Sequence, residues 1–130
     1  MVYTSYFAQL KNLPNTIAPI AICGKSPDWY TGLQYKKLAP KIGFFQEWKK
    51  THDNDYYVKC FYEQVLSFLT ADQVMRELNA LSGGKDVALL CYEKPGDFCH
   101  RHIVSEWLNK SGYDVHEYCF RSFLQTEFVI

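Results

Sequence analysis

An unbroken run of five apolar residues, Val87-Ala88-Leu89-Leu90-Cys91, constrains the fold of this chain more than any other feature. Gly83-Gly84 precedes the run and Pro95-Gly96 follows it, so the segment has the length of a strand rather than of a buried helix. A strand with one face in water would alternate apolar and polar residues, and this run does not. It therefore predicts a strand that is covered on both faces, as in a parallel sheet between helices.

Further strands and helices are expected to alternate along the chain. The predicted strands are 2–7, 17–22, 86–93 and 115–118, and the predicted helices are 41–50, 55–69, 71–82 and 98–110. Thr70 and Gln73 form a capping box for the third helix, and Asp97 is a suitable N-cap for the fourth. This pattern predicts an α/β fold, with residues 1–130 as a single three-layer domain whose small, mostly parallel sheet is flanked by helices on both faces.

The composition narrows the functional class. With 48% apolar and 17% aromatic residues, the chain should form a packed core. Lys and Arg number 14, as do Asp and Glu, so net charge indicates neither nucleic acid nor membrane. We expect a cytoplasmic protein without a membrane partner, because no run resembles a signal peptide or membrane span. Five scattered cysteines predict reduced thiols, no metal and no cofactor: Cys23, Cys60, Cys91, Cys99 and Cys119.

The segment from Cys91 to Arg101 has the layout of a ligand site, because a strand, a tight turn and a helix start follow one another. Strand alternation places Cys91 and Glu93 on one face of the strand. Helical spacing places Arg101 on the apolar, core-facing stripe of the helix, where a guanidinium needs an anionic partner. Two partners are open: Glu93, in a structural ion pair, or a ligand phosphate or carboxylate, in a clamp.

Two groups in this segment could carry chemistry. The thiol of Cys99 is expected in the first helical turn, where the helix dipole and neighbouring cations favour thiolate, and His100 could assist it as a nucleophile. Glu93 could act as a general acid or base, which is the preferred role because it needs no activated thiol. Cys91, inside an apolar strand, should be the less reactive cysteine. A purely structural role for each cysteine is also open.

A second region could complete the pocket. Gly24 and Lys25 follow the second predicted strand and should lie at the same sheet edge, where Gly24 permits close approach and Lys25 attracts an anion. Trp29 could stack on a base, or wedge the loop onto the core. Ser5, in the first predicted strand, offers a hydroxyl at a similar level of the sheet to the ends of the other strands.

The residues of these segments resemble the domain of unknown function 488 family, in a short branch with a Cys-x-Glu … Cys-His-Arg signature. The matching residues are Leu89-Leu90-Cys91-Tyr92-Glu93-Lys94, Phe98-Cys99-His100-Arg101, Val104 and Trp107-Leu108, with Tyr3-Thr4-Ser5-Tyr6-Phe7, Ile20-Ala21-Ile22 and Pro27-Asp28-Trp29 in the amino-terminal half. The resemblance implies a compact α/β domain and a site around Cys91, Glu93, Cys99, His100 and Arg101. The family has no settled activity, so the resemblance locates a site without naming its reaction.

The leading functional hypothesis is an enzyme whose pocket binds a small anionic ligand, such as a nucleotide or a nucleic-acid end. An alternative is a non-catalytic module that binds a nucleotide-like signal or a partner protein. A third is a thiol redox sensor that uses Cys91 and Cys99. The apolar tail from residue 120 to residue 130 would suit a homodimer interface.

Overall fold

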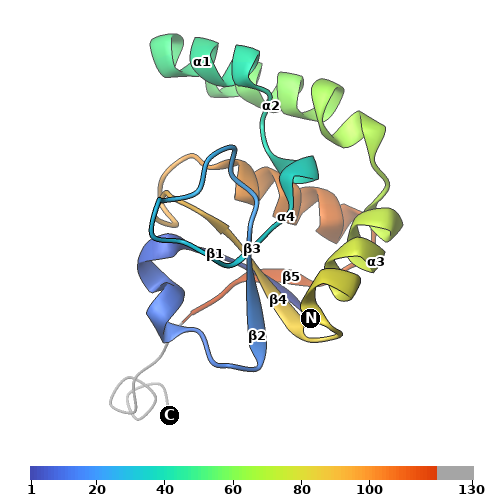
Figure 1. Ribbon diagram of the computed structural model, residues 1–130. Coiled ribbons are helices and arrows are strands. Elements are labelled where there is room, and N and C mark those ends of the chain that lie inside the picture. Colours follow the sequence, from blue (N-terminus) through green and yellow to red (C-terminus); the bar gives the residue numbers. More distant parts are fainter. Residues whose placement is uncertain (120–130) are drawn as a thin grey trace, which may run out of the picture.

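A computed structural model describes residues 1–119; the tail suggested as a dimer interface, residues 120–130, lies outside the described residues. Five strands form one sheet in the order β3-β2-β4-β1-β5, and every neighbouring pair is parallel (Figure 1). The strands are β1 (Val2–Tyr6), β2 (Ile17–Ala21), β3 (Leu33–Gln34), β4 (Asp86–Cys91) and β5 (Val115–Glu117). The predicted α/β class with a mostly parallel sheet is confirmed.

Helices connect these strands. The α-helices are α1 (Ile42–Thr51), α2 (Asn54–Gln64), α3 (Ala71–Ser82) and α4 (His100–Lys110), and the 3-10 helices are η1 (Phe7–Asn12), η2 (Lys36–Leu38) and η3 (Leu66–Phe68). At the start of α3 the Thr70 hydroxyl accepts from the Gln73 N–H at 3.1 Å, and at its end Gly83 has a left-handed φ of 68°. Within residues 1–119, no helix has the length and apolar character needed to cross a membrane.

The four α-helices lie on one face of the sheet. The chain first moves from β1 through β2 to β3, toward one edge, and then returns through β4 to β5. Right-handed crossovers that run in opposite directions leave on opposite faces of a sheet. The rule therefore places η1 on one face and α1–α4 on the other, as Figure 1 shows. Helices flank both faces, as predicted, but within the described residues the second face has only this short 3-10 helix.

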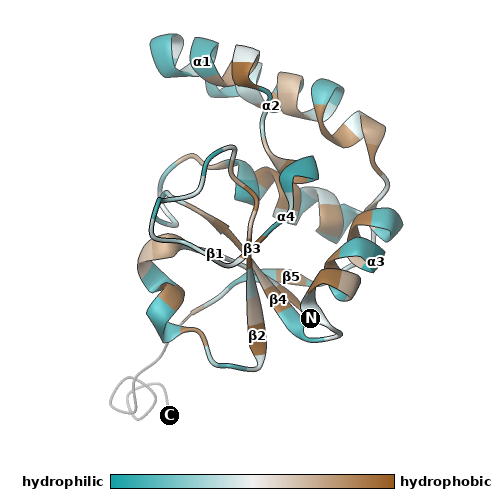
Figure 2. Ribbon diagram, viewed as in Figure 1, coloured by the Kyte–Doolittle hydropathy of each residue, from teal (hydrophilic) through white to brown (hydrophobic). Residues whose placement is uncertain are grey.

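Each face of the sheet has its own core. Leu89 and Cys91 of β4 belong to a cluster to which all four α-helices contribute buried residues, and this side is called the helical face. Leu90 faces the opposite way and packs with Phe7 and Tyr30, and this side is called the aromatic face. Figure 2 shows hydrophobic residues concentrated on β2 and β4. The double covering of β4 accounts for its unbroken apolar run.

The predicted start of the last helix is wrong. Helix α4 begins at His100, with Cys99 at the N-cap, and not at residue 98 with Asp97 as the cap. The backbone N–H of Asp97 instead donates to the Lys94 carbonyl at 3.0 Å, which closes a turn. Cys99 is therefore the N-cap residue of α4 and does not lie inside the first helical turn.

Two other boundaries differ from the prediction by two residues or more. Helix α2 ends at Gln64 and is followed by η3, so the expected helix 55–69 is divided. Strand β4 ends at Cys91, which leaves Glu93 in the turn beyond the strand. Strand β3 and helix η2 lie inside residues 24–40, a stretch in which no strand or helix was predicted.

Candidate functional site

Strands β2 and β4 are parallel neighbours, so their carboxyl ends lie side by side at the end of the sheet where the strands finish. After β2 the chain leaves over the aromatic face, and after β4 it leaves over the helical face, so a crevice opens between the two strand ends. A cavity of about 510 Å³ lies in this crevice and is called the β2/β4 cavity. It is lined by Cys23, Gly24, Lys25, Lys36, Ala39, Pro40, Ile42, Phe45, Cys91, Tyr92, Glu93 and His100.

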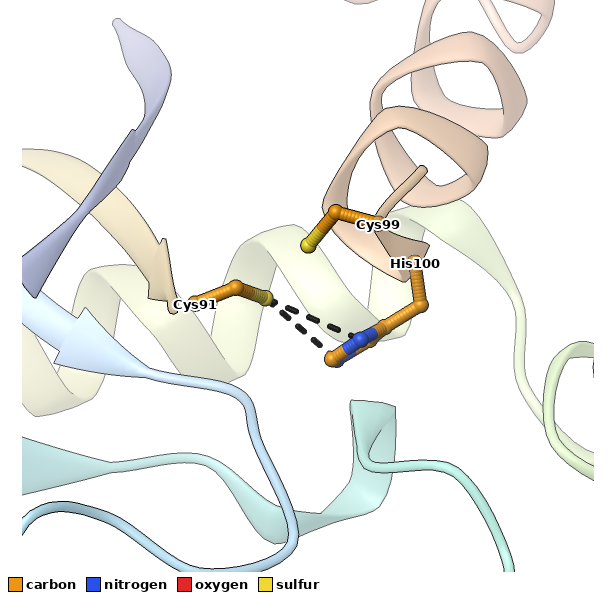
Figure 3. A group of neighbouring side chains, drawn as sticks. All are labelled: Cys91, Cys99 and His100. Carbon is orange, nitrogen blue, oxygen red and sulfur yellow. Dashed lines mark hydrogen bonds between the residues drawn. The ribbon is translucent and has the colours of Figure 1, made fainter. Parts of the chain in front are cut away.

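Two thiols and an imidazole meet beside this cavity. Cys91 is the last residue of β4, Cys99 is the N-cap residue of α4, and His100 is the first residue of that helix. Their two sulfur atoms and a ring nitrogen lie within 4.8 Å of one another (Figure 3). The sulfur of Cys91 is 3.7 Å from Nδ1 and 3.6 Å from Nε2 of His100. The Nε2 atom also lies 2.7 Å from the carbonyl oxygen of Ile22. Because a carbonyl only accepts, Nε2 carries the proton of the neutral imidazole, and Nδ1 is then an acceptor.

The surroundings of the two thiols shift their pKa values in opposite directions. Donation by the Cys91 thiol lowers the pKa of Cys99, and a hydrogen bond and the charge of His100 lower it further. Burial raises the pKa of Cys91, and the interaction of its thiol with Cys99 raises this pKa further. The pKa of Cys99 is therefore lower than that of Cys91, and Cys99 is the more readily ionised of the two thiols.

The Glu93 carboxyl lines the same cavity and is half-buried. Burial raises its pKa above the usual value, and the negative charge on Cys99 raises it further. A carboxyl that keeps its proton to higher pH than usual is suited to proton transfer near neutrality.

Arg101 is completely buried, and its partner is neither of the two expected from the sequence. Its Nε and Nη2 atoms donate to the two carboxylate oxygens of Glu117, each at 3.1 Å, and Nη1 donates to the backbone carbonyl of Glu93 at 2.7 Å. The Thr4 hydroxyl donates to the same Glu117 carboxylate at 2.6 Å. The prediction of a side-chain pair between Arg101 and Glu93 is wrong, because β5 places Glu117 beside β1 and within reach of the guanidinium. Arg101 does not line the β2/β4 cavity.

The cations of the cavity come from the other strand end. Lys25 and Gly24 line it, as the sequence suggested. Lys36 also lines it and was missed, because it stands in η2, directly after the short strand β3. Its ammonium donates to the Gly24 carbonyl. A lysine just after a third parallel strand would have been recognised if the two residues of β3 had carried a strand signal.

Two predicted residues lie elsewhere. Ser5 is completely buried in β1 and does not line the cavity; within residues 1–119 its hydroxyl has no hydrogen-bond partner. Trp29 is 61% exposed, and its ring meets Phe7 and Tyr30 edge-on, on the aromatic face. Neither side chain is brought to Cys91, Cys99 and His100.

The donor set of Cys91, Cys99 and His100 has the sulfur and imidazole ligands that soft metals prefer. Among the described residues the group has three members, whereas a closed structural zinc site has four. The prediction of no metal and no cofactor stays a prediction.

Residues 6–112 match the family model described as the active DUF488-N3 subclade. No curated protein and no solved structure matches the chain.

Proposed function

The chain belongs to the DUF488 family, and we propose that it is an enzyme that binds a small anion, of the nucleotide or nucleic-acid-end class, in the β2/β4 cavity and transforms it there. One observation carries the proposal: the same cavity is lined by two lysines and by Cys91, Glu93 and His100. A single ligand in this cavity can therefore contact both the lysines, which would bind an anion, and the side chains that would transfer protons.

Binding rests on Lys25 and Lys36. Both side chains are exposed, and both line the cavity, so their ammonium groups can meet a phosphate or carboxylate as point charges. The rest of the wall includes Ile42, Phe45 and Tyr92, which supply apolar and aromatic surface for a base or another flat ring. The buried guanidinium of Arg101 takes no part in this contact, since its donors are bound to Glu117 and to the Glu93 carbonyl.

Chemistry rests first on Glu93, which acts as the general acid or base. Its carboxyl faces the bound anion, and its raised pKa favours proton transfer near neutral pH. Cys99 is the candidate nucleophile, with His100 to take up and return the thiol proton. Arg101 acts as a positioning residue, because it holds the Glu93 backbone and the start of α4 together.

The rival is a binding module that releases its ligand unchanged. It is favoured by the apolar surface at the cavity, where Ile42 is 72% exposed and Tyr92 is 49% exposed. Such surface suits capture of a ring or of a partner's side chain and needs no catalytic group.

The experiment has two steps. Thermal shifts with nucleoside mono- and diphosphates, inorganic phosphate and 5′-phosphorylated oligonucleotides identify ligands, since a ligand that binds only the folded state raises its melting temperature. Mass spectrometry after long incubation then shows whether a new product forms. For the enzyme we expect a product whose rate falls by roughly 10²-fold or more in Glu93→Gln, with the thermal shift retained.

The matched control is Glu106→Gln, which removes an exposed carboxyl of α4 that pairs only with Lys110. It should keep the wild-type rate. Release of an unchanged ligand would favour the binding module. Full turnover in both Glu93→Gln and Cys99→Ser would refute the catalytic assignment, and the absence of any thermal shift in the panel would refute the anion site.

A further inference from the structure

Cys91 has no role in the proposed reaction, yet its position beside Cys99 is specific. The two sulfurs and a nitrogen of His100 lie within 4.8 Å of one another, and Figure 3 shows the Cys91 sulfur directed toward the imidazole and the Cys99 sulfur directed toward Cys91. The cysteines come from different elements, the end of β4 and the N-cap of α4. Both side chains are almost completely buried, with 1% and 4% exposed. The fold thus isolates a pair of thiols from bulk solvent.

The pair is chemically unequal. Cys91 and His100 lie beside Cys99 and lower its pKa, whereas burial raises the pKa of Cys91, so Cys99 ionises more readily than Cys91. A thiolate attacks an electrophile and a neighbouring thiol can then resolve the product, so the two positions have the properties of an attacking and a resolving cysteine.

We propose that Cys99 and Cys91 form a reversible disulfide in reaction with a hydroperoxide. The Cys99 thiolate attacks the terminal oxygen of the hydroperoxide, the O–O bond breaks, and the alkoxide that leaves takes a proton to become an alcohol. Cys99 is then a sulfenic acid, oxidised by two electrons. The Cys91 sulfur attacks it, an S–S bond forms, and the hydroxide that leaves takes the Cys91 proton to become water.

The surroundings permit both steps. Cys91 and His100 line the β2/β4 cavity, and Cys99 lies beside a smaller hollow of about 20 Å³ that Glu93 and His100 also line. A small peroxide would reach Cys99 past Glu93 and His100, which line both spaces. The sulfurs must close to about 2.05 Å for a disulfide. The chain between the two cysteines, residues 92–98, contains no helix or strand, so it can follow this movement.

The disulfide has a consequence for the site. It removes the Cys99 thiolate, so an oxidised protein lacks its candidate nucleophile while Lys25, Lys36 and Glu93 are unchanged. The redox reaction needs only the two sulfurs and does not depend on the proposed anionic substrate. Its test and the test of the proposed function can therefore fail separately.

The test treats reduced, full-length protein with one equivalent of hydrogen peroxide or cumene hydroperoxide, then alkylates it under denaturing conditions. We expect three of the five cysteines to be alkylated and one disulfide-linked peptide pair, Cys91 with Cys99. The mass of the unalkylated protein should fall by about 2 Da, and a thiol reductant should restore it.

Variants separate the two roles. Cys91→Ser should stop at a sulfenic acid on Cys99 that dimedone traps, and Cys99→Ser should consume the peroxide at least about tenfold more slowly. Cys60→Ser, which changes a buried cysteine of α2, is the matched control and should behave as wild type. Circular dichroism confirms that each variant is folded. Five free thiols after treatment, or a disulfide that includes Cys23, would overturn the proposal.

Discussion

The ends of β4 and β2 lie side by side, but their cations differ in kind. After β4 the cation is Arg101, which is completely buried and bound by Glu117. After β2 the cations of the cavity are Lys25 and the nearby Lys36, and both are exposed. A buried, paired charge holds other groups in place, whereas an exposed ammonium keeps donors available for a ligand. This difference supports the proposal that the β4 end positions the reacting groups and the β2 end binds the anion.

The largest expected effect is at the β4 end. Arg101→Met leaves the Glu117 carboxylate, which is 22% exposed, with the Thr4 hydroxyl but without its cation, and it leaves the Glu93 carbonyl without the guanidinium donor. We expect a loss of roughly 3 kcal/mol in the free energy of unfolding, as for other buried ion pairs from which one partner is removed. Urea denaturation measures it.

The control for this variant is Lys110→Met. Its ion pair with Glu106 joins two side chains that are 68% and 63% exposed, so the loss of stability should be far smaller than in Arg101→Met. Equal losses in the two variants would mean that burial does not distinguish Arg101, and the comparison between the strand ends would fail.

A smaller effect is expected at the β2 end. The double variant Lys25→Met, Lys36→Met should unfold within about 0.5 kcal/mol of wild type, because neither lysine is buried. Its affinity for an anionic ligand should fall by roughly tenfold, and the salt dependence of binding should weaken. Titration at two salt concentrations measures both. Unchanged affinity together with lower stability would reverse the roles given to the two strand ends.

The smallest effect is the pH dependence of Glu93. Its pKa is raised above 4.5, so the folded protein holds this proton more tightly than the unfolded chain. That contribution to stability is complete below about pH 4.5 and is lost as pH rises through the raised pKa. Wild type should therefore lose stability relative to Glu93→Gln between about pH 4.5 and pH 7.5, as measured by melting temperatures at both pH values. A constant difference would show that the cavity does not disfavour the carboxylate.

The sequence predicts the β4 end well, because local pattern determines it. An apolar run of this length requires a two-sided strand, and helical spacing correctly predicts that Arg101 faces the core. The partner of Arg101 could not be predicted, since Glu117 comes from β5, and only the pairing of Thr4 with Glu117 brings it near. Local pattern does not contain the register of two strands that far apart.

The β2 end was predicted less completely. Gly24 and Lys25 follow a strand that the sequence shows, but Lys36 follows β3, which has only two residues and no apolar run. The N-cap of α4 was missed for a different reason. Asp97 is a favourable cap by residue type, yet its backbone N–H is used in a turn with Lys94, and the helix begins two residues later than predicted.

The parallel pairing of β1 also bears on how the chain folds. Strand β1, which comes first among the described strands, lies between the two that come last, and its contacts span 85 residues to β4 and 113 residues to β5. Long loops must therefore close before the middle of the sheet is paired, which predicts folding on the slower, millisecond-to-second scale of such topologies. A nascent chain that ends before Glu117 has neither a partner for Arg101 nor an outer neighbour for β1. The site can therefore assemble only late, after nearly all of the described chain has left the ribosome.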